Sequence, residues 1–302
     1  MKKTGLIGLG SISKHIFYGI QFSKMLKLVS CADVDEKTKE KANENNCSFF
    51  TDYSEMIKKE KLEYVIISTP PSTHYDIIKN CLNAGVNVLV EKPAVLDLNQ
   101  WDEIVAIAKQ KNLHFEVIYH WQNGEEIKKI KNFDLSAVKN IKISSNDPYS
   151  QDGKTALPDR VALGGSWIDS GINILSVLQI YLPLKTYKIL KVENVLCEQT
   201  NIPIASKVDL LIDSVNVEIE IDWRNNLNQK ITELGFDDEK IILHHSHQSI
   251  IRNGEEVVYS TEVRMNKHYK NYFSRDSHNV DLIGGRKIHE ILFKVRDCYE
   301  KI

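Results

Sequence analysis

The chain lacks the features of an exported or membrane-bound protein. Its five cysteines are scattered and form no C-x-x-C pair, which argues against a disulfide framework and against a zinc site. No apolar run is long enough to span a bilayer. The apolar stretch near the N-terminus is cut short by polar residues at 13–15, and no small-residue cleavage site follows it. We therefore expect a soluble protein of the reducing cytoplasm.

A strong net charge is also absent. The 302 residues contain 39 Lys and Arg against 41 Asp and Glu, which gives a formal net charge of −2. Because these charges are spread along the chain, the basic surface that nucleic acid or an anionic membrane requires is not predicted. The length predicts about two domains, and an apolar content of 42% is enough for ordinary cores. A small molecule is the expected ligand.

Residues 1–120 alternate short apolar runs with amphipathic helical patterns, which is the order of βαβ units. The predicted strands are 3–7, 28–32, 64–68, 86–90 and 115–118. The predicted helices are 14–25, 36–45, 72–84 and 99–110. Short apolar runs of this kind are typical of parallel strands that are buried on both faces. We therefore predict an α/β fold whose first domain, 1–120, is a doubly wound Rossmann domain.

Residues 121–302 have a different pattern, with apolar and polar residues alternating along several runs. These runs are 140–145, 188–198, 207–212, 215–223, 230–234 and 240–245. The alternation predicts an open antiparallel sheet with one solvated face, interrupted by one apolar helix over 166–180. A helical pattern over 284–302 suggests a segment that packs back on the first domain. We interpret 121–302 as a substrate-binding and oligomerisation domain.

The segment Gly8-Leu9-Gly10-Ser11-Ile12-Ser13 fits the dinucleotide-binding fingerprint, with Ser13 in place of the third glycine. The first two glycines allow a tight turn and bring backbone N–H groups at a helix start close to a pyrophosphate. An ordinary strand-to-helix turn could carry the same glycines, but the preceding strand and following helix favour a nucleotide site. The cofactor-binding candidates here are Gly8, Gly10, Ser11 and Ile12.

The acid Asp33 follows about 20 residues later, where it would reach the ribose of the adenosine. A carboxylate there hydrogen-bonds the ribose hydroxyls of NAD and repels the extra phosphate of NADP. We therefore favour NAD, while Lys37 keeps NADP open as the alternative.

Two further motifs complete a family resemblance. The segment Ser68-Thr69-Pro70-Pro71-Ser72-Thr73-His74 follows one predicted strand, and Glu91-Lys92-Pro93 follows the next. Together with the glycine turn, these motifs make residues 1–120 resemble the Gfo/Idh/MocA oxidoreductases. The resemblance implies that the first segment lines the nicotinamide and that Lys92 lies beside both nicotinamide and substrate. It adds as cofactor-binding candidates Ser68, Thr69, Pro70, His74, Glu91 and Lys92.

Asp169 and Asn173 lie one helical turn apart, so their side chains share one face of an otherwise apolar helix. Asp169 could simply complement the helix dipole. This helix resembles the substrate helix of the same family, with Asn173 where many members have histidine. Together with Trp223, this departure looks most similar to the galactose and arabinose 1-dehydrogenase branch. The stretch from Tyr149 to Leu163 does not match that branch well.

That resemblance implies the functional residues. The catalytic candidates are Lys92, Asp169 and Asn173. The substrate-binding candidates are His120, Asp147, Asp169, Asn173 and Trp223. If Lys92 orients the sugar hydroxyl and steadies developing charge, Asp169 is a suitable base, and Asn173 can hold the substrate oxygen but cannot accept its proton. Either Asp169 or Lys92 can carry the base role.

We therefore predict an NAD(P)-dependent dehydrogenase that oxidises an aldose, galactose-like or arabinose-like, at C1 to the aldonolactone. The alternatives are oxidation of a ring hydroxyl of an inositol or modified sugar, and a non-catalytic dinucleotide-binding sensor. The resemblance also implies a homodimer formed through the second sheet. His245 and His247 share one face of a predicted strand, but a third ligand of recognisable spacing is missing. We expect a solvated strand face there and no metal.

Overall fold

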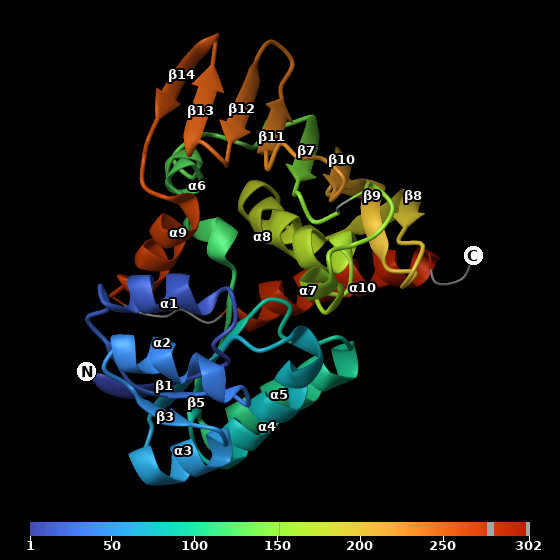
Figure 1. Ribbon diagram of the computed structural model, residues 1–302. Helices are drawn as coiled ribbons and strands as arrows, with labels where there is room; N and C mark the ends of the chain where they lie inside the picture. Colours follow the sequence, from blue (N-terminus) through green and yellow to red (C-terminus); the bar gives the residue numbers. More distant parts are fainter. Residues whose placement is uncertain (151, 277–280, 300–302) are drawn as a thin grey trace. The chain divides into compact units, whose positions relative to one another are not determined.

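The computed structural model describes residues 1–150, 152–276 and 281–299, and these form two compact units. The first unit contains Met1–His120 together with Met265–Arg286, and the second contains Trp121–Arg264 together with residues from 287 onward (Figure 1). Among the described residues, no helix combines the length and the apolar character that crossing a membrane requires.

The first unit is built on a parallel sheet of six strands in the order β3-β2-β1-β4-β5-β6. Its strands are β1 (Lys2–Ile7), β2 (Leu26–Ala32), β3 (Ser48–Phe50), β4 (Tyr64–Ile67), β5 (Asn87–Glu91) and β6 (Phe115–Ile118). Its helices are α1 (Ser13–Ile20), η1 (Glu36–Thr38), α2 (Lys39–Glu44), α3 (Tyr53–Glu60), α4 (Pro71–Asn83), α5 (Leu98–Lys111) and η2 (His120–Asn123), which runs on into the second unit. Every residue of β6 is buried, and so are the last four of β1 and of β5. The expected Rossmann sheet is confirmed.

Two elements of this unit are absent from the sequence prediction, and one boundary is wrong. Strand β3 has three residues, too few for a recognisable pattern, and helix α3 follows it within two residues. Helix α1 ends at Ile20 rather than at 25, because β2 already begins at Leu26. The Rossmann topology is unaffected, since β3 only adds an edge strand beside β2.

A segment from the end of the chain also belongs to the first unit. Helix α9 (Arg264–Phe273) contributes Tyr269, Tyr272 and Phe273 to a buried cluster with Leu6 and Leu9. The sequence prediction placed the returning segment at 284–302. In the structure α10 (Leu282–Tyr299) belongs to the first unit only up to Arg286, and residues 300–302 lie outside the described part. The buried aromatic residues explain why α9 is the segment that returns.

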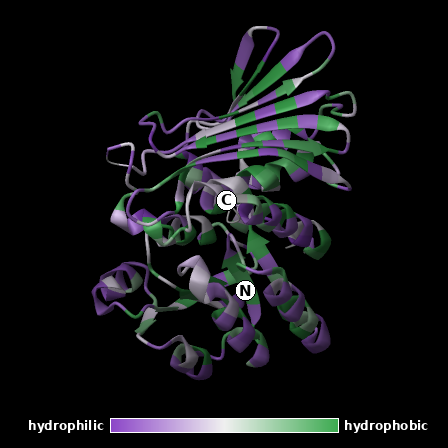
Figure 2. Cartoon of the chain, turned by 90° about the vertical axis from the view of Figure 1, so that its right-hand side faces the viewer, coloured by the Kyte–Doolittle hydropathy of each residue, from purple (hydrophilic) through white to green (hydrophobic). Residues whose placement is uncertain are grey.

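The second unit is built on a sheet of eight strands in the order β14-β13-β12-β11-β7-β10-β9-β8. Its strands are β7 (Asn140–Asn146), β8 (Tyr187–Leu196), β9 (Pro203–Ile212), β10 (Val215–Asp222), β11 (Lys230–Gly235), β12 (Lys240–His244), β13 (Ser249–Arg252) and β14 (Glu255–Val258). Neighbouring strands are antiparallel, except that β10 pairs with β7 in parallel, which the sequence prediction did not include. Hydrophobic and hydrophilic residues alternate along these strands (Figure 2), as expected for a sheet with one buried face.

Helices cover the buried face of this sheet. They are α6 (Glu125–Ile130), α7 (Pro158–Val161), the π-helical turn η3 (Trp167–Gly171), α8 (Ile172–Tyr181) and the part of α10 that follows Arg286. The indole Nε1 of Trp167 donates a hydrogen bond of 2.9 Å to the Leu292 carbonyl, which ties η3 to α10. The first seven residues of α8 are all buried, which fixes the orientation of the helix start, where η3 carries Asp169 and α8 carries Asn173.

Candidate active site

The glycine turn lies at the carboxyl end of β1, against the end of β4. Gly8 has φ +93°, and a Cβ atom there would lie 2.8 Å from the carbonyl carbon of Ser68. The Ser68 hydroxyl donates to the Gly8 carbonyl oxygen over 2.8 Å. A side chain at Gly8 would therefore force the two loops apart, because L residues rarely adopt this φ and the space is filled.

The residues after this turn present unpaired backbone donors. Among the described residues, none accepts a hydrogen bond from the backbone N–H groups of Gly10, Ser11 or Ile12. Gly10 is exposed, with open space where a Cβ would stand. Helix α1 begins directly afterwards at Ser13. Free N–H groups at a helix start are the donor set that a pyrophosphate requires, so these residues fit a dinucleotide.

The carboxylate of Asp33 is held at the same edge of the sheet. Its Oδ2 accepts a hydrogen bond of 2.6 Å from the Leu9 N–H, and its Oδ1 accepts one of 2.9 Å from the Asp35 N–H. The Lys41 ammonium group donates to the Leu9 carbonyl over 2.7 Å, so the residue whose N–H binds Asp33 also holds a cation. The sequence analysis considered Lys37 for this place and missed Lys41, because α2 brings it back from eight residues beyond Asp33.

His74 joins the two remaining cofactor motifs. Its Nε2 lies 2.8 Å from the Thr69 carbonyl oxygen and its Nδ1 lies 2.8 Å from the Pro93 carbonyl oxygen. Burial lowers the pKa of His74, although the two carbonyl groups act in the opposite direction. The positive charge of Lys92 also lowers that pKa, which places Lys92 near His74. The structure therefore brings the 68–74 and 91–93 segments together.

Helix α9 adds polar contacts to this part of the first unit. The Tyr269 hydroxyl donates a short hydrogen bond to the buried carboxylate of Glu91. His120 is buried, stacks on the Tyr269 ring at 5.8 Å, and has its Nδ1 atom 3.3 Å from Nδ1 of His268. Sequence reasoning found Glu91 and His120 but missed their partners, because nothing in the sequence indicates that α9 returns to this unit.

In the second unit, the side chains of two substrate-binding candidates and of one lysine meet at one edge of the buried sheet face. Asp147 follows β7 and Trp223 follows β10, and the parallel register of these strands makes the two residues neighbours. Lys230 begins β11, where it pairs with Ser145. The Lys230 ammonium group donates to Asp147 Oδ1 over 2.7 Å, and also to the Asn146 carbonyl and to Asn228 Oδ1. The Lys230 ammonium group therefore donates to three oxygen atoms. The sequence analysis missed this residue.

Asp169 and Asn173 belong to the same region. The Asn173 amide donates to the Asp169 carbonyl oxygen over 3.2 Å, and the buried Asn173 Oδ1 accepts no hydrogen bond within the described chain. Burial raises the pKa of Tyr149, and the carboxylates of Asp169 and Asp147 raise it further. Both carboxylates therefore lie close to the Tyr149 hydroxyl. The structure brings together the predicted residues Asp147, Asp169, Asn173 and Trp223 within the second unit.

The histidine cluster differs from the sequence prediction. His245 is 1% exposed and contacts Glu126 Oε1 over 2.9 Å and Thr232 Oγ1 over 2.8 Å, so it is a buried residue rather than part of a solvated face. His247 instead stacks on His244, with ring centroids 3.8 Å apart. The chain turns after β12, which ends the alternation on which the prediction depended. Within the described residues, no three His, Cys, Asp or Glu side chains form a group that could hold a metal ion.

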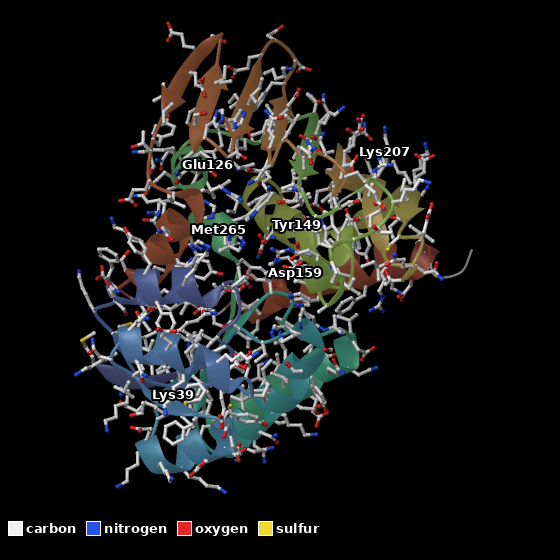
Figure 3. All side chains as sticks on the ribbon, viewed as in Figure 1. Lys39, Glu126, Tyr149, Asp159, Lys207 and Met265 are labelled. Carbon is white, nitrogen blue, oxygen red and sulfur yellow. The ribbon has the colours of Figure 1, made fainter. Side chains whose placement is uncertain are left out.

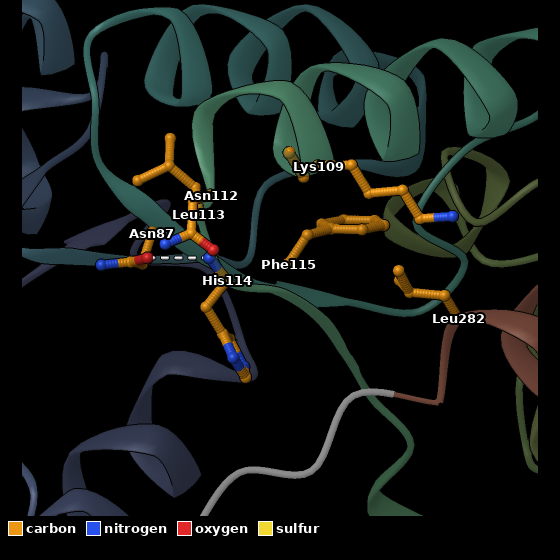
Figure 4. A pocket seen from close by; sticks show the side chains of 8 residues that line it. Asn87, Lys109, Asn112, Leu113, His114, Phe115 and Leu282 are labelled. Atoms are coloured by element: carbon orange, nitrogen blue, oxygen red, sulfur yellow. Dashed lines mark hydrogen bonds between the residues drawn. The ribbon is translucent and has the colours of Figure 1, made fainter.

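A separate surface hollow of about 510 Å³ lies in the first unit (Figure 4). Its lining includes Asn87, His114 and Phe115, and the His114 N–H donates to Asn87 Oδ1 over 2.8 Å. These residues begin or precede β5 and β6, so the hollow lies at the amino edge of the parallel sheet. The glycine turn lies at the carboxyl edge, where ligands of such sheets bind.

Comparisons with known proteins agree with this arrangement. Residues 2–119 match the family model described as "Oxidoreductase family, NAD-binding Rossmann fold". An uncharacterized oxidoreductase of Schizosaccharomyces pombe is 36% identical over 81 residues, which are 27% of this chain and 22% of that protein. The UDP-N-acetylglucosamine 3-dehydrogenase of Acidithiobacillus ferrooxidans is 30% identical over 112 residues, which are 37% of this chain and 34% of that protein.

The fold itself recurs over the whole chain. The crystal structure of KijD10, a 3-ketoreductase from Actinomadura kijaniata in complex with NADP and TDP-benzene, has a TM-score of 0.84 at 14% identity and covers 98% of this chain and 97% of that chain. In sequence, by contrast, the chain spans less than half the length of the curated relatives above. Residues 2–119 are therefore similar to the NAD-binding Rossmann domain of the Gfo/Idh/MocA oxidoreductases.

Proposed function

We propose that this protein is an NAD(P)-dependent dehydrogenase that oxidises a sugar hydroxyl, and more specifically C1 of a galactose-like or arabinose-like aldose. The observation that carries the proposal is the cluster in the second unit. It combines a carboxylate, Asp169, with the unpartnered amide oxygen of Asn173 and the buried indole of Trp223. In such a set the carboxylate can accept a proton, the amide can bind a hydroxyl, and the indole can pack against a sugar ring.

The first unit supports the choice of cofactor. Free N–H groups at Gly10, Ser11 and Ile12 suit the pyrophosphate, and the Asp33 carboxylate suits the ribose hydroxyls of NAD. Lys41 beside Asp33 offers a cation to the additional phosphate of NADP. We infer NAD as the preferred cofactor, with NADP as the weaker one. When bound, the oxidised nicotinamide accepts a hydride.

The proposed chemistry assigns one task to each residue. Asp169 accepts the proton of the C1 hydroxyl as its O–H bond breaks. Lys92 donates a hydrogen bond to the same oxygen and stabilises the negative charge that develops there. Asn173 holds a substrate hydroxyl through its amide and takes no proton. The C1–H bond breaks as the hydride leaves, the C–O bond becomes a carbonyl, and the product is the aldonolactone.

A second candidate is oxidation of a ring hydroxyl. The relative that is 30% identical over 112 residues is named a UDP-N-acetylglucosamine 3-dehydrogenase, and this name supports oxidation at a ring carbon. The two candidates differ in product, because C1 oxidation yields a lactone whereas ring oxidation yields a ketone. The position of the chain in the galactose and arabinose 1-dehydrogenase branch stays a prediction.

The test is a panel of aldoses, inositols and nucleotide sugars with NAD or NADP, following NAD(P)H formation and identifying the product by NMR. We expect NADH with at least one sugar, and a lactone if C1 is the site. The variants Lys92→Met and Asp169→Asn should each lower kcat by roughly 100-fold or more. Asp237→Asn, which removes an exposed carboxylate paired with Lys139 at 3.6 Å, is the matched control. Dinucleotide binding without turnover of any substrate would support the sensor instead.

We also infer that the protein forms a homodimer through the solvent face of the large sheet. Strand β8 ends that sheet and carries three apolar side chains that are 41–51% exposed: Leu190, Val195 and Leu196. Exposed apolar residues on an edge strand favour pairing with another surface. Analytical ultracentrifugation should show a dimer for the wild type and a monomer for the Leu190→Lys, Val195→Lys double variant. A monomeric wild type would contradict the inference.

A further inference from the structure

Three buried nitrogen atoms around Tyr149 and Trp121 have no acceptor within the described chain. They are Nε of Arg160, Nη1 of Arg264 and Nε1 of Trp223. Buried donors are normally hydrogen-bonded, because leaving one unpaired costs free energy. Asn173 Oδ1 on the substrate helix is a buried acceptor that also has no partner there. The three unpaired donors of this region predict a ligand that accepts hydrogen bonds.

Arg264 begins α9 and has no ion pair within the described chain. Its guanidinium group lies over the Trp121 ring at 5.9 Å. Burial lowers the pKa of Arg264, and the charges of Asp147 and Glu126 act in the opposite direction. Glu126 does not neutralise it by contact, because one carboxylate oxygen binds His245 and the other accepts no hydrogen bond.

Arg160 packs against Tyr149. Its guanidinium carbon is 4.6 Å from the centre of the Tyr149 ring, and its one ion pair is with its exposed neighbour Asp159 at 3.4 Å. The positive charges of Arg160 and Arg264 both counteract the rise in the Tyr149 pKa, so both guanidinium groups lie near this tyrosine. Tyr149 also packs edge-on against Trp223, with ring centroids 5.4 Å apart. Figure 3 labels Tyr149 among the side chains of the second unit.

The third cation of the region, Lys230, already has hydrogen-bond acceptors. Lys230 is 3% exposed and donates to three oxygens, one of them on Asp147. Arg160 and Arg264, by contrast, each keep one buried guanidinium nitrogen without an acceptor in the part of the chain that the structure describes. Arginine presents a planar set of donors that matches the oxygens of a phosphate or a carboxylate.

We propose that the substrate carries an anionic group, a phosphate or a carboxylate, that binds between Arg160 and Arg264, with the Trp223 indole as a further donor. This inference rests on the proposed function, because the same pocket would hold the sugar that Asp169 deprotonates. It also gives a physical reason why 149–163 departs from the aldose dehydrogenase branch. A neutral aldose can offer hydroxyl oxygens to these N–H groups, but no negative charge to the two guanidinium cations.

The test compares three sugars that share one ring: galactose, galacturonate and galactose 6-phosphate. Isothermal titration calorimetry with NAD present should show that at least one anionic sugar binds about tenfold or more tightly than galactose. Its identity distinguishes carboxylate from phosphate. Arg160→Gln and Arg264→Gln should each weaken binding of that anionic sugar far more than binding of galactose, so that most of the preference is lost. Arg252→Gln, which removes an exposed guanidinium paired with Glu239, should change nothing.

Arg264→Lys keeps the positive charge but loses the planar set of N–H donors, so it should retain part of the preference for the anionic sugar. It also shows whether Arg264→Gln loses the preference merely because the variant misfolds. Three results would overturn the proposal. They are equal affinity for the three sugars, no binding of either anionic sugar, and an equal loss of affinity for galactose and for the anionic sugars in Arg264→Gln. Failure of the proposed function looks different. In that case no NAD(P)H forms from any sugar, while tight binding of the anionic sugar and its loss in Arg264→Gln remain.

Discussion

The Leu9 N–H donates a hydrogen bond of 2.6 Å to Oδ2 of Asp33, which fixes this carboxylate beside the glycine turn. A carboxylate held there should repel the extra phosphate of NADP. We expect Asp33→Ser to raise the ratio of kcat/KM for NADP to that for NAD by roughly 10-fold to 100-fold. Asp35→Ser is the control, because Asp35 caps η1 through the Lys37 N–H. Steady-state kinetics with both dinucleotides measures the ratio, and an unchanged ratio in Asp33→Ser would contradict the assigned role.

His74 should make stability depend on pH. Burial lowers its pKa in the folded state below 6.5, so between that lowered pKa and 6.5 the unfolded chain binds more protons than the folded one. The free energy of unfolding should therefore fall as the pH drops from about 7.5 to about 5.5. His74→Gln should show a shallower fall in urea unfolding measured at both pH values. Identical slopes for the variant and the wild type would show that another group is responsible.

The Tyr269 hydroxyl should stabilise the first unit through Glu91. Burial and the neighbouring Glu91 raise the Tyr269 pKa well above its ordinary value, so the hydroxyl stays protonated and donates. Tyr269→Phe leaves a buried carboxylate oxygen without this donor and should lower the free energy of unfolding by about 1–3 kcal/mol. Tyr259→Phe is the matched control, since the Tyr259 hydroxyl donates no hydrogen bond within the described chain. Equal stability of the two variants in urea would refute the contribution.

The Lys230 and Asp147 pair should be far more sensitive than a surface ion pair. The two side chains are 3% and 9% exposed and their charged atoms are 2.7 Å apart. Removing one partner leaves the other charge buried, so Lys230→Met should lower the free energy of unfolding by about 3–5 kcal/mol. Lys207→Met breaks an exposed pair with Glu220 and should change the free energy of unfolding far less, because water screens this pair. Chemical denaturation compares both variants, and similar losses would show that burial is not decisive.

Much of the fold follows from local patterns. The apolar runs of the first domain predict five of its six parallel strands, and alternation predicts six of the eight strands of the second sheet. The short strand β3, the hairpin β13–β14 and helix α9 were missed. Strand β3 has only three residues, too few for an alternation, and the exposed residues of β14 show no buried face. The π-helical turn that carries Asp169 also has no signal in a pattern based on 3.6 residues per turn.

The site was predictable where one short motif carries the chemistry. The glycine turn, the 68–74 segment and Glu91-Lys92 do meet at one edge of the first sheet. Residues such as Lys41, Lys230 and Arg264 were missed, because their roles depend on which distant backbone or carboxylate they reach. A lone lysine or arginine in a sequence is ordinarily a solvated surface residue, and only the contacts made in the folded chain distinguish these three from the rest.

The account depends on Lys92 and Asp169 acting on the same substrate oxygen. A crystal structure with dinucleotide and sugar bound tests this most directly. We predict that Nζ of Lys92 and a carboxylate oxygen of Asp169 both lie about 2.6–3.2 Å from the hydroxyl that is oxidised. A sugar bound with that hydroxyl beyond the reach of either group would contradict the account.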